Sequence, residues 1–107
     1  MSDRMWRYKI NLSNNMIMIV CGHLCEKAVE YRCLGQTISK ESDINPEGTG
    51  STRKLAKKLF SFGEVKSIKF WQNRVFLTIS KKTTREEAEQ ITRSTMKILV
   101  QFHLDES

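Results

Sequence analysis

The sequence predicts an α+β fold, a single small domain in which two helices pack on a mostly antiparallel sheet. Two observations point to this class. Short segments with alternating or continuous apolar residues predict strands, and two later segments with apolar residues every three or four positions predict helices. A chain of 107 residues holds one hydrophobic core, so the expected domain is 1–107 with its core at about 6–103. The expected order of elements is ββ(β)αββα.

The first segment, 6–21, predicts a β-hairpin. Apolar and polar residues alternate over 6–12 (WRYKINL), which is the period of a strand with one buried face. The polar residues 13–15 (SNN) favour a turn, and the apolar run 16–20 (MIMIV) has the length of a strand.

Two less regular segments follow this hairpin. Residues 28–34 (AVEYRCL) fit a third strand or a short helix, because their propensities favour neither. Residues 35–50 hold the only proline and three of the five glycines, and they predict a loop. The end of this loop, GTGSTRK, either binds an anion through the backbone N–H groups of Gly48 and Gly50 or is a linker that caps the next helix.

A helix is predicted next, with Ser51 or Thr52 as its capping residue and Gly63 as its stop. Positively charged side chains lie mostly on its outer side. Its apolar side is formed by Leu55, Ala56, Leu59, Phe60 and Phe62.

A second hairpin follows, with strands at 65–70 and 75–79 and a turn at 72–74. Alternation directs Phe70 into the core together with Ile68. Trp71 and Phe76 are then the aromatic residues that we expect to be exposed.

The last helix is predicted at about 84–103. Thr83 with Glu86, or Thr84 with Glu87, forms a capping box at its start. Its apolar side recurs at spacings of three and four, at Ala88, Ile91, Thr95, Ile98, Leu99 and Phe102.

Positive charge is concentrated in the middle of the chain. The net charge is +6, from 18 basic and 12 acidic residues. Residues 53–85 contain ten basic residues and one acidic residue, whereas 1–50 are neutral and 86–107 carry −3. Such a segment attracts nucleic acid, an anionic membrane surface or an acidic protein, or it only keeps the protein soluble.

Composition excludes several classes of protein. The longest apolar run, 16–21, is far shorter than the roughly 20 residues of a bilayer span, and the N-terminus lacks the apolar region of a signal peptide. We therefore expect a cytoplasmic protein with reduced thiols and no membrane span. No pattern of nucleophile and base is visible, so we expect no enzymatic activity.

The cysteines give a metal-site hypothesis. Cys21, Cys25 and Cys33, together with His23, supply the ligand types of zinc and of iron–sulfur clusters. The spacing CGHLC is C-x3-C, whereas structural sites use C-x2-C, and a cysteine in a strand also serves as a small core residue. The expectation is therefore no metal and no cofactor.

The second hairpin also suggests contact with nucleic acid. In KSIKFWQNRVFLTISKK, Phe70, Trp71 and Phe76 are rings on which bases can stack, although Phe70 is expected in the core. Basic side chains between them would contact phosphates. The alternative is that the exposed rings cover the second face of the sheet.

The stretch SxxKLAKKLFSFGEVKSIKFWQNRVFLTISK resembles the N-terminal domain of Nfu/NifU-type iron–sulfur scaffold proteins. In that family a helix of the kind SPLAxxLF leads into a GVKSVFF strand, a turn and a FITVTK strand. The opening LSNNMIMIV stands where the family has TPNPNxLKF, without its prolines, and the resemblance covers roughly 6–103. The matching residues are Leu55, Ala56, Leu59, Phe60, Val65, Lys66, Ser67, Ile68, Phe70, Leu77, Thr78 and Lys81.

The resemblance implies this fold and an association with iron–sulfur cluster assembly. The cluster-binding C-x2-C of the family belongs to a separate C-terminal domain that this sequence lacks, so no ligand residues are carried over. A lone domain of this kind is expected to bind protein partners.

We therefore expect a non-enzymatic interaction module that docks an acidic partner, by resemblance an iron–sulfur assembly protein, through one basic helix–hairpin face. The alternative is a small basic nucleic-acid-binding protein that uses the same face. The residues expected at this face are Arg53, Lys54, Lys57, Lys58, Lys66, Lys69, Trp71 and Arg74.

Overall fold

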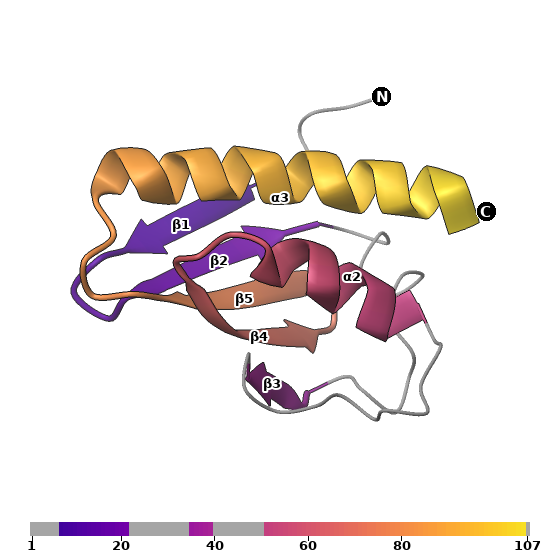
Figure 1. The fold of residues 1–107 in the computed structure, drawn as a ribbon, viewed down its shortest axis with the longest axis horizontal. Helices are drawn as coiled ribbons and strands as arrows, with labels where there is room; N and C mark the ends of the chain where they lie inside the picture. The colour runs from indigo at the N-terminus through magenta and orange to yellow at the C-terminus, as the bar shows by residue number, and fades with distance from the viewer. Residues whose placement is uncertain (1–6, 22–34, 40–50, 107) are drawn as a thin grey trace.

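The computed structural model describes residues 7–21, 35–39 and 51–106. In this part of the chain five strands form one antiparallel sheet, and two helices lie on one of its faces (Figure 1), which confirms the predicted α+β class. The strands are β1 (Arg7–Asn11), β2 (Met16–Val20), β3 (Thr37–Ser39), β4 (Val65–Trp71) and β5 (Arg74–Ile79). The helices are α2 (Ser51–Phe60) and α3 (Arg85–Glu106).

The strand order is β1-β2-β5-β4-β3, so β5 lies at the centre of the sheet. The hairpins β1–β2 and β4–β5 are neighbours in the sheet because β2 pairs with β5. Helix α3 packs over β1 and β2, and α2 packs over β4 and against α3. One face of the sheet is therefore covered by helices, and we call the other the open face.

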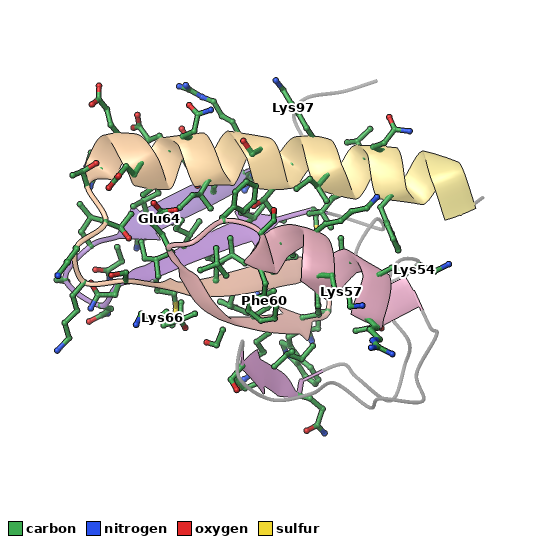
Figure 2. The ribbon with its side chains drawn as sticks, viewed as in Figure 1. Lys54, Lys57, Phe60, Glu64, Lys66 and Lys97 are labelled. Carbon is green, nitrogen blue, oxygen red and sulfur yellow. The ribbon has the colours of Figure 1, made fainter. Side chains whose placement is uncertain are left out.

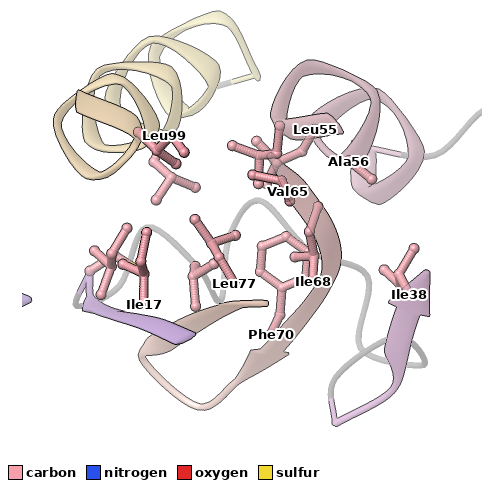
Figure 3. Close-up of a cluster of buried hydrophobic side chains, with 14 of the residues drawn as sticks. Ile17, Ile38, Leu55, Ala56, Val65, Ile68, Phe70, Leu77 and Leu99 are labelled. Atoms are coloured by element: carbon pink, nitrogen blue, oxygen red, sulfur yellow. The ribbon is translucent and has the colours of Figure 1, made fainter. Parts of the chain in front are cut away.

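The core fills the space between the sheet and the helices (Figure 3). Alternation along the strands places every second side chain in this layer. The strands contribute Ile17, Ile19, Ile38, Val65, Ile68, Phe70, Val75, Leu77 and Ile79. The helices contribute Leu55, Ala56, Leu59, Ala88, Ile91, Leu99 and Phe102.

Both predicted hairpins are present. The turn of the first ends at Asn15, which adopts a positive φ of 54° and whose carbonyl oxygen accepts a 2.8 Å hydrogen bond from the Ile79 N–H. The second turn is shorter than predicted, because Arg74 pairs with Trp71 and already belongs to β5. Only Gln72, with a φ of 53°, and Asn73 remain in the loop.

Strand β3 corrects the prediction of a loop over 35–50. Ile38 is 6% exposed and pairs with Ile68, so a single buried side chain anchors this three-residue strand. A pattern of three residues is too short to be recognised as alternation. The predicted strand or helix at 28–34 and the glycines at 48 and 50 lie outside the described residues.

The starts of the two helices differ in how well the sequence predicts them. Thr52 is buried within α2, so it is not the capping residue. At α3 the second predicted capping box is confirmed, since the Thr84 N–H donates to Glu87 Oε1 at 2.8 Å and the Glu87 N–H donates to Thr84 Oγ1 at 3.1 Å. The described helices include none with the length and apolar character needed to cross a membrane.

Replacing Thr95 with valine should stabilise the protein by about 1 kcal/mol, because an unpaired buried hydroxyl carries a desolvation penalty. Thr95 is fully buried on α3 and its Oγ1 has no hydrogen-bond partner. Thr92, one turn earlier, is equally buried, but its Oγ1 donates to the Ala88 carbonyl at 2.8 Å. Thr92→Val is therefore the matched control and should give no gain. Urea unfolding of both variants measures the difference, and an equal response would contradict the argument.

Candidate binding surfaces

The residues predicted to form one basic helix–hairpin face lie on two surfaces. Helix α2 packs on the side of β4 that carries Ile68 and Phe70. Alternation therefore directs Lys69 and Trp71 to the open face, away from α2. Arg74 pairs with Trp71 and lies on the same face. The prediction of a single face is wrong, because a helix and the outward residues of the strand beneath it cannot share a surface.

Lys66 belongs clearly to neither group. It is exposed at the start of β4, at the irregularity in the pairing with β5 between Val65 and Ser67. A bulge adds one unpaired residue to a strand. Lys66 is that residue, so the alternation of the rest of β4 does not place its side chain.

The first surface, which we call the α2 basic surface, consists of Arg53, Lys54, Lys57 and Lys58. Lys54 and Lys57 project from the helix (Figure 2) and are exposed. Neither of them forms an ion pair with another residue of the described ranges. Lys58 is also exposed, and its Nζ lies 5.4 Å from the centroid of the Phe102 ring, a cation–π contact between α2 and α3.

The charge at the start of α2 opposes the stability of the helix, whereas Lys57 and Lys58 stand in the last turn, where the helix dipole favours cations. Cations in the first turn, such as Lys54, interact unfavourably with the positive end of the helix dipole, and α2 has no acidic residue there. Residues four positions apart are neighbours on a helix, so Lys54 faces Lys58 and Arg53 faces Lys57, both like-charge pairs. Helix stability therefore does not explain the position of Lys54 or its proximity to Lys58, whereas an anionic partner would.

The second surface is the open face of the sheet. The register forms three rows across the strands, and residues of one row are direct neighbours on that face. The central row holds Lys9, Met18, Phe76, Lys69 and Thr37. The second row holds Arg7, Val20, Arg74 and Trp71, and the third holds Asn11, Met16, Thr78, Ser67 and Ser39.

These three rows contain four basic side chains and no acidic one. Trp71 is 46% exposed and Met16 37% exposed, and Phe76 and Met18 are partly exposed. The predictions that Phe70 is buried and Trp71 exposed are confirmed, whereas Phe76, also expected to be exposed, is only partly so. The open face therefore combines accessible rings with positive charge.

Gly35 supports the ring of Trp71. The Gly35 N–H donates to the Phe70 carbonyl at 2.6 Å, and its φ of +79° lies in the region that favours glycine. A Cβ built on Gly35 would lie 3.1 Å from Cε3 and 3.2 Å from Cζ3 of the indole. The absence of a side chain at Gly35 thus allows the indole to lie against the backbone, which holds the ring in place.

Two shallow hollows lie on the open face, one on each side of Phe76 and Met16. The larger, of about 370 Å³, is lined by Met16, Thr37, Ser67, Lys69, Phe76 and Thr78. The smaller, of about 170 Å³, is lined by Lys9, Asn11, Asn14, Met16, Met18 and Phe76. Hydroxyl, amide and ammonium groups thus surround an apolar centre.

A third hollow lies on the helix side, beside the start of α3. It has a volume of about 550 Å³, and its lining includes Glu64, Glu86, Glu87 and Glu89. Glu86 and Glu87 stand in the first turn of α3, where carboxylates are stabilised by the helix dipole, and Glu87 is part of the capping box. This acidic group therefore has a structural explanation.

The candidate metal ligands receive no support from the described residues. Cys21 is 3% exposed and disulfide-bonded, which differs from the reduced thiol expected for it, and its Sγ lies 3.4 Å from the Asn73 carbonyl oxygen. A sulfur in a disulfide is not a thiolate ligand. Cys25, Cys33 and His23 lie outside the described residues, and no metal-binding group of three or more His, Cys, Asp or Glu occurs within them.

The open face contains residues that the sequence analysis did not select, among them Lys9, Met16, Met18 and Gly35. Alternation in β1 already placed Lys9 opposite the apolar side of that strand. The sequence did not show which strands lie beside β1, because pairing between distant segments leaves no local pattern.

Comparison of the chain with protein-family models, with curated proteins and with solved structures gives no match.

Proposed function

We propose that this protein is a non-enzymatic interaction module that captures an acidic partner protein through the α2 basic surface. The observation that carries the proposal is the gathering of four basic side chains, Arg53, Lys54, Lys57 and Lys58, on one side of a ten-residue helix. Lys54 stands in the first turn and faces Lys58 as a like charge, and both features oppose the stability of the helix. Proteins retain such destabilising features where function needs them. Lys69, Trp71 and Arg74, expected earlier at this surface, are not part of it.

The proposed partner is a protein of iron–sulfur cluster assembly. This part of the proposal is supported by the resemblance to Nfu/NifU-type N-terminal domains, which implies a hairpin, a helix, a second hairpin and a final helix in this order. The described elements follow that order, with β3 added before α2. A cytoplasmic location belongs to the same proposal, and the disulfide of Cys21 is the observation against it, since reducing compartments disfavour disulfides.

Charge reversal on α2 tests the capture. The wild-type protein, immobilised and exposed to a nuclease-treated lysate of the source organism, should retain a cysteine desulfurase or other cluster-assembly proteins. The double variant Lys54→Glu/Lys57→Glu should retain roughly tenfold less, because charge complementarity governs encounter and register. Lys81→Glu/Lys82→Glu, which changes two exposed lysines of the β5–α3 turn by the same charge, is the matched control. Equal loss in both variants, or no loss in the first, would contradict the proposal.

Lys54→Glu alone should increase stability by about 1 kcal/mol while it weakens capture. The carboxylate would lie in the first turn, where the helix dipole favours it, and would face Lys58 as an opposite charge four residues on. Lys57→Glu has the same change of charge in the last turn, where the dipole opposes it, so no gain is expected there. Thermal unfolding of both variants measures the contrast. A loss of stability in Lys54→Glu would show that Lys54 has a structural role.

A further inference from the structure

The open face of the sheet has a composition that the α2 basic surface lacks. On α2 the exposed groups are lysines, whereas the open face combines Trp71 and Phe76 with Arg7, Lys9, Lys69 and Arg74. Aromatic rings do not strengthen the electrostatic attraction of an acidic peptide, but they are surfaces on which nucleobases stack. The two surfaces therefore call for ligands of different chemistry.

The rings are placed so that one strand of nucleic acid can reach both. Phe76 pairs with Lys69, and Trp71 is two residues further along β4, so the rings are diagonal neighbours at a spacing of roughly 7–8 Å. Phe76 lies between Met18 and Lys69 in the central row. The Trp71 indole rests on Gly35. Both rings are thus held by the sheet before any ligand binds, which lowers the entropic cost of binding.

The cations surround these rings on the same face. Lys69 is the direct neighbour of Phe76, and Arg74 is the direct neighbour of Trp71. The Arg74 side chain is partly exposed, although its Nε is buried and has no hydrogen-bond partner. Lys9 lies in the row of Phe76, and Arg7 lies in the row of Arg74. Both stand on β1, at the edge of the sheet, and β2 separates them from β5. Phosphates on either side of a stacked base would therefore meet positive charge.

The hollows beside Phe76 suit the edges of bases. The larger one offers the hydroxyl groups of Thr37, Ser67 and Thr78, and the smaller one offers the Asn14 amide. The Asn11 amide also lines the smaller hollow, but its Oδ1 already accepts hydrogen bonds from the Ser13 Oγ and the Asn14 N–H. Both group types donate and accept hydrogen bonds, as base edges do. Bases within a duplex are stacked and paired, so they cannot lie on Phe76 or Trp71, whereas the bases of a single strand can.

We propose that the open face of the sheet binds single-stranded nucleic acid, with Phe76 and Trp71 stacking two bases and Arg7, Lys9, Lys69 and Arg74 contacting phosphates. The site is independent of the α2 basic surface, which lies on the other layer of the fold. An acidic protein at the open face is the competing occupant, and the experiment separates the two.

The test measures fluorescence anisotropy of a labelled oligouridylate and a labelled oligothymidylate of about 10 nucleotides, a length within the range of single-strand binding sites. A duplex of the same length and a polyglutamate peptide are the comparison ligands. The wild-type protein should bind the single strands more tightly than the duplex or the peptide. Tighter binding of the peptide would overturn the proposal in favour of an acidic protein, and equal binding of the duplex would overturn the role of stacking.

Three variants locate the site. Phe76→Ala and Trp71→Ala should each weaken single-strand binding roughly tenfold to a hundredfold. Lys69→Ala should reduce the slope of log affinity against log salt by about 1 while the rings continue to stack. Circular dichroism confirms that each variant is folded, and if Phe76→Ala is not, Trp71→Ala and Lys69→Ala still decide the question.

Tyr8→Ala is the matched control. Tyr8 is 45% exposed, nearly as much as Trp71, but it pairs with Ile19 and so lies on the helix-covered side of the sheet. Its replacement should leave oligonucleotide binding unchanged. An equal effect of Tyr8→Ala and Trp71→Ala, or no effect of either ring variant, would overturn the assignment of the open face.

Discussion

Phe70→Ala should destabilise the protein by about 3–5 kcal/mol, the usual effect of removing a large core side chain. Phe70 is fully buried on β4, beneath α2 and next to the central strand β5 (Figure 3). Alanine would leave a cavity that the sheet cannot close, because the backbone of β4 is held by β3 on one side and β5 on the other. Small domains have total stabilities of about 5–15 kcal/mol, so this single change removes a large fraction.

The next residue of the same strand provides the control. Trp71→Ala removes a larger side chain, yet it should destabilise by about 1 kcal/mol or less, because nearly half of the Trp71 surface is already in water. Urea unfolding of both variants gives the two free energies directly. A loss at Trp71 as large as the loss at Phe70 would mean that the second face of the sheet is also covered, and the proposed single-strand site would then be lost with it.

Local patterns in the sequence predict those parts of the fold that depend on near neighbours. Alternation places Phe70 inside and Trp71 outside, and the spacing of Thr84 and Glu87 marks the start of α3. Both patterns act within a few residues, so one segment contains all the information that they need.

The features that the sequence did not predict depend on contacts between distant segments. The neighbourhood of β2 and β5 brings Met18 beside Phe76, although the two are far apart in the chain. Strand β3 exists because Ile38 meets Ile68. Each depends on tertiary packing, which composition and periodicity do not describe.

The prediction of a single basic face is wrong for the same reason. Charge counted along the sequence joins α2 and the second hairpin into one segment, since both lie within 53–85. Packing then separates their charges, because the apolar side of α2 meets the apolar side of β4 and the outward residues of each point in opposite directions. A cluster in sequence becomes two surfaces whenever the elements that carry it pack against each other.

Gly35→Ala should destabilise the protein by about 2–3 kcal/mol and also disturb the Trp71 ring. One part of this effect is the positive φ of +79°, which is strained for any residue with a Cβ. The other part is the approach of the new Cβ to Cε3 and Cζ3 of the indole at 3.1 and 3.2 Å, closer than ordinary van der Waals contact. The Gly35 N–H that pairs with the Phe70 carbonyl makes a large movement of this backbone unfavourable.

A double-mutant cycle separates the two parts. In the Trp71→Ala background the indole is absent, so Gly35→Ala should there retain only the backbone strain, and its effect should fall by about 1 kcal/mol. If the effect is the same in both backgrounds, the ring is free to move away and Gly35 does not hold it. In that case the single variant Gly35→Ala should leave single-strand binding unchanged. If Gly35 does hold the ring, Gly35→Ala should weaken single-strand binding, although every side chain that contacts phosphate is intact. The cycle thus tests whether the indole is positioned before a base arrives, which is the feature that distinguishes a built stacking site from an aromatic residue that is merely exposed.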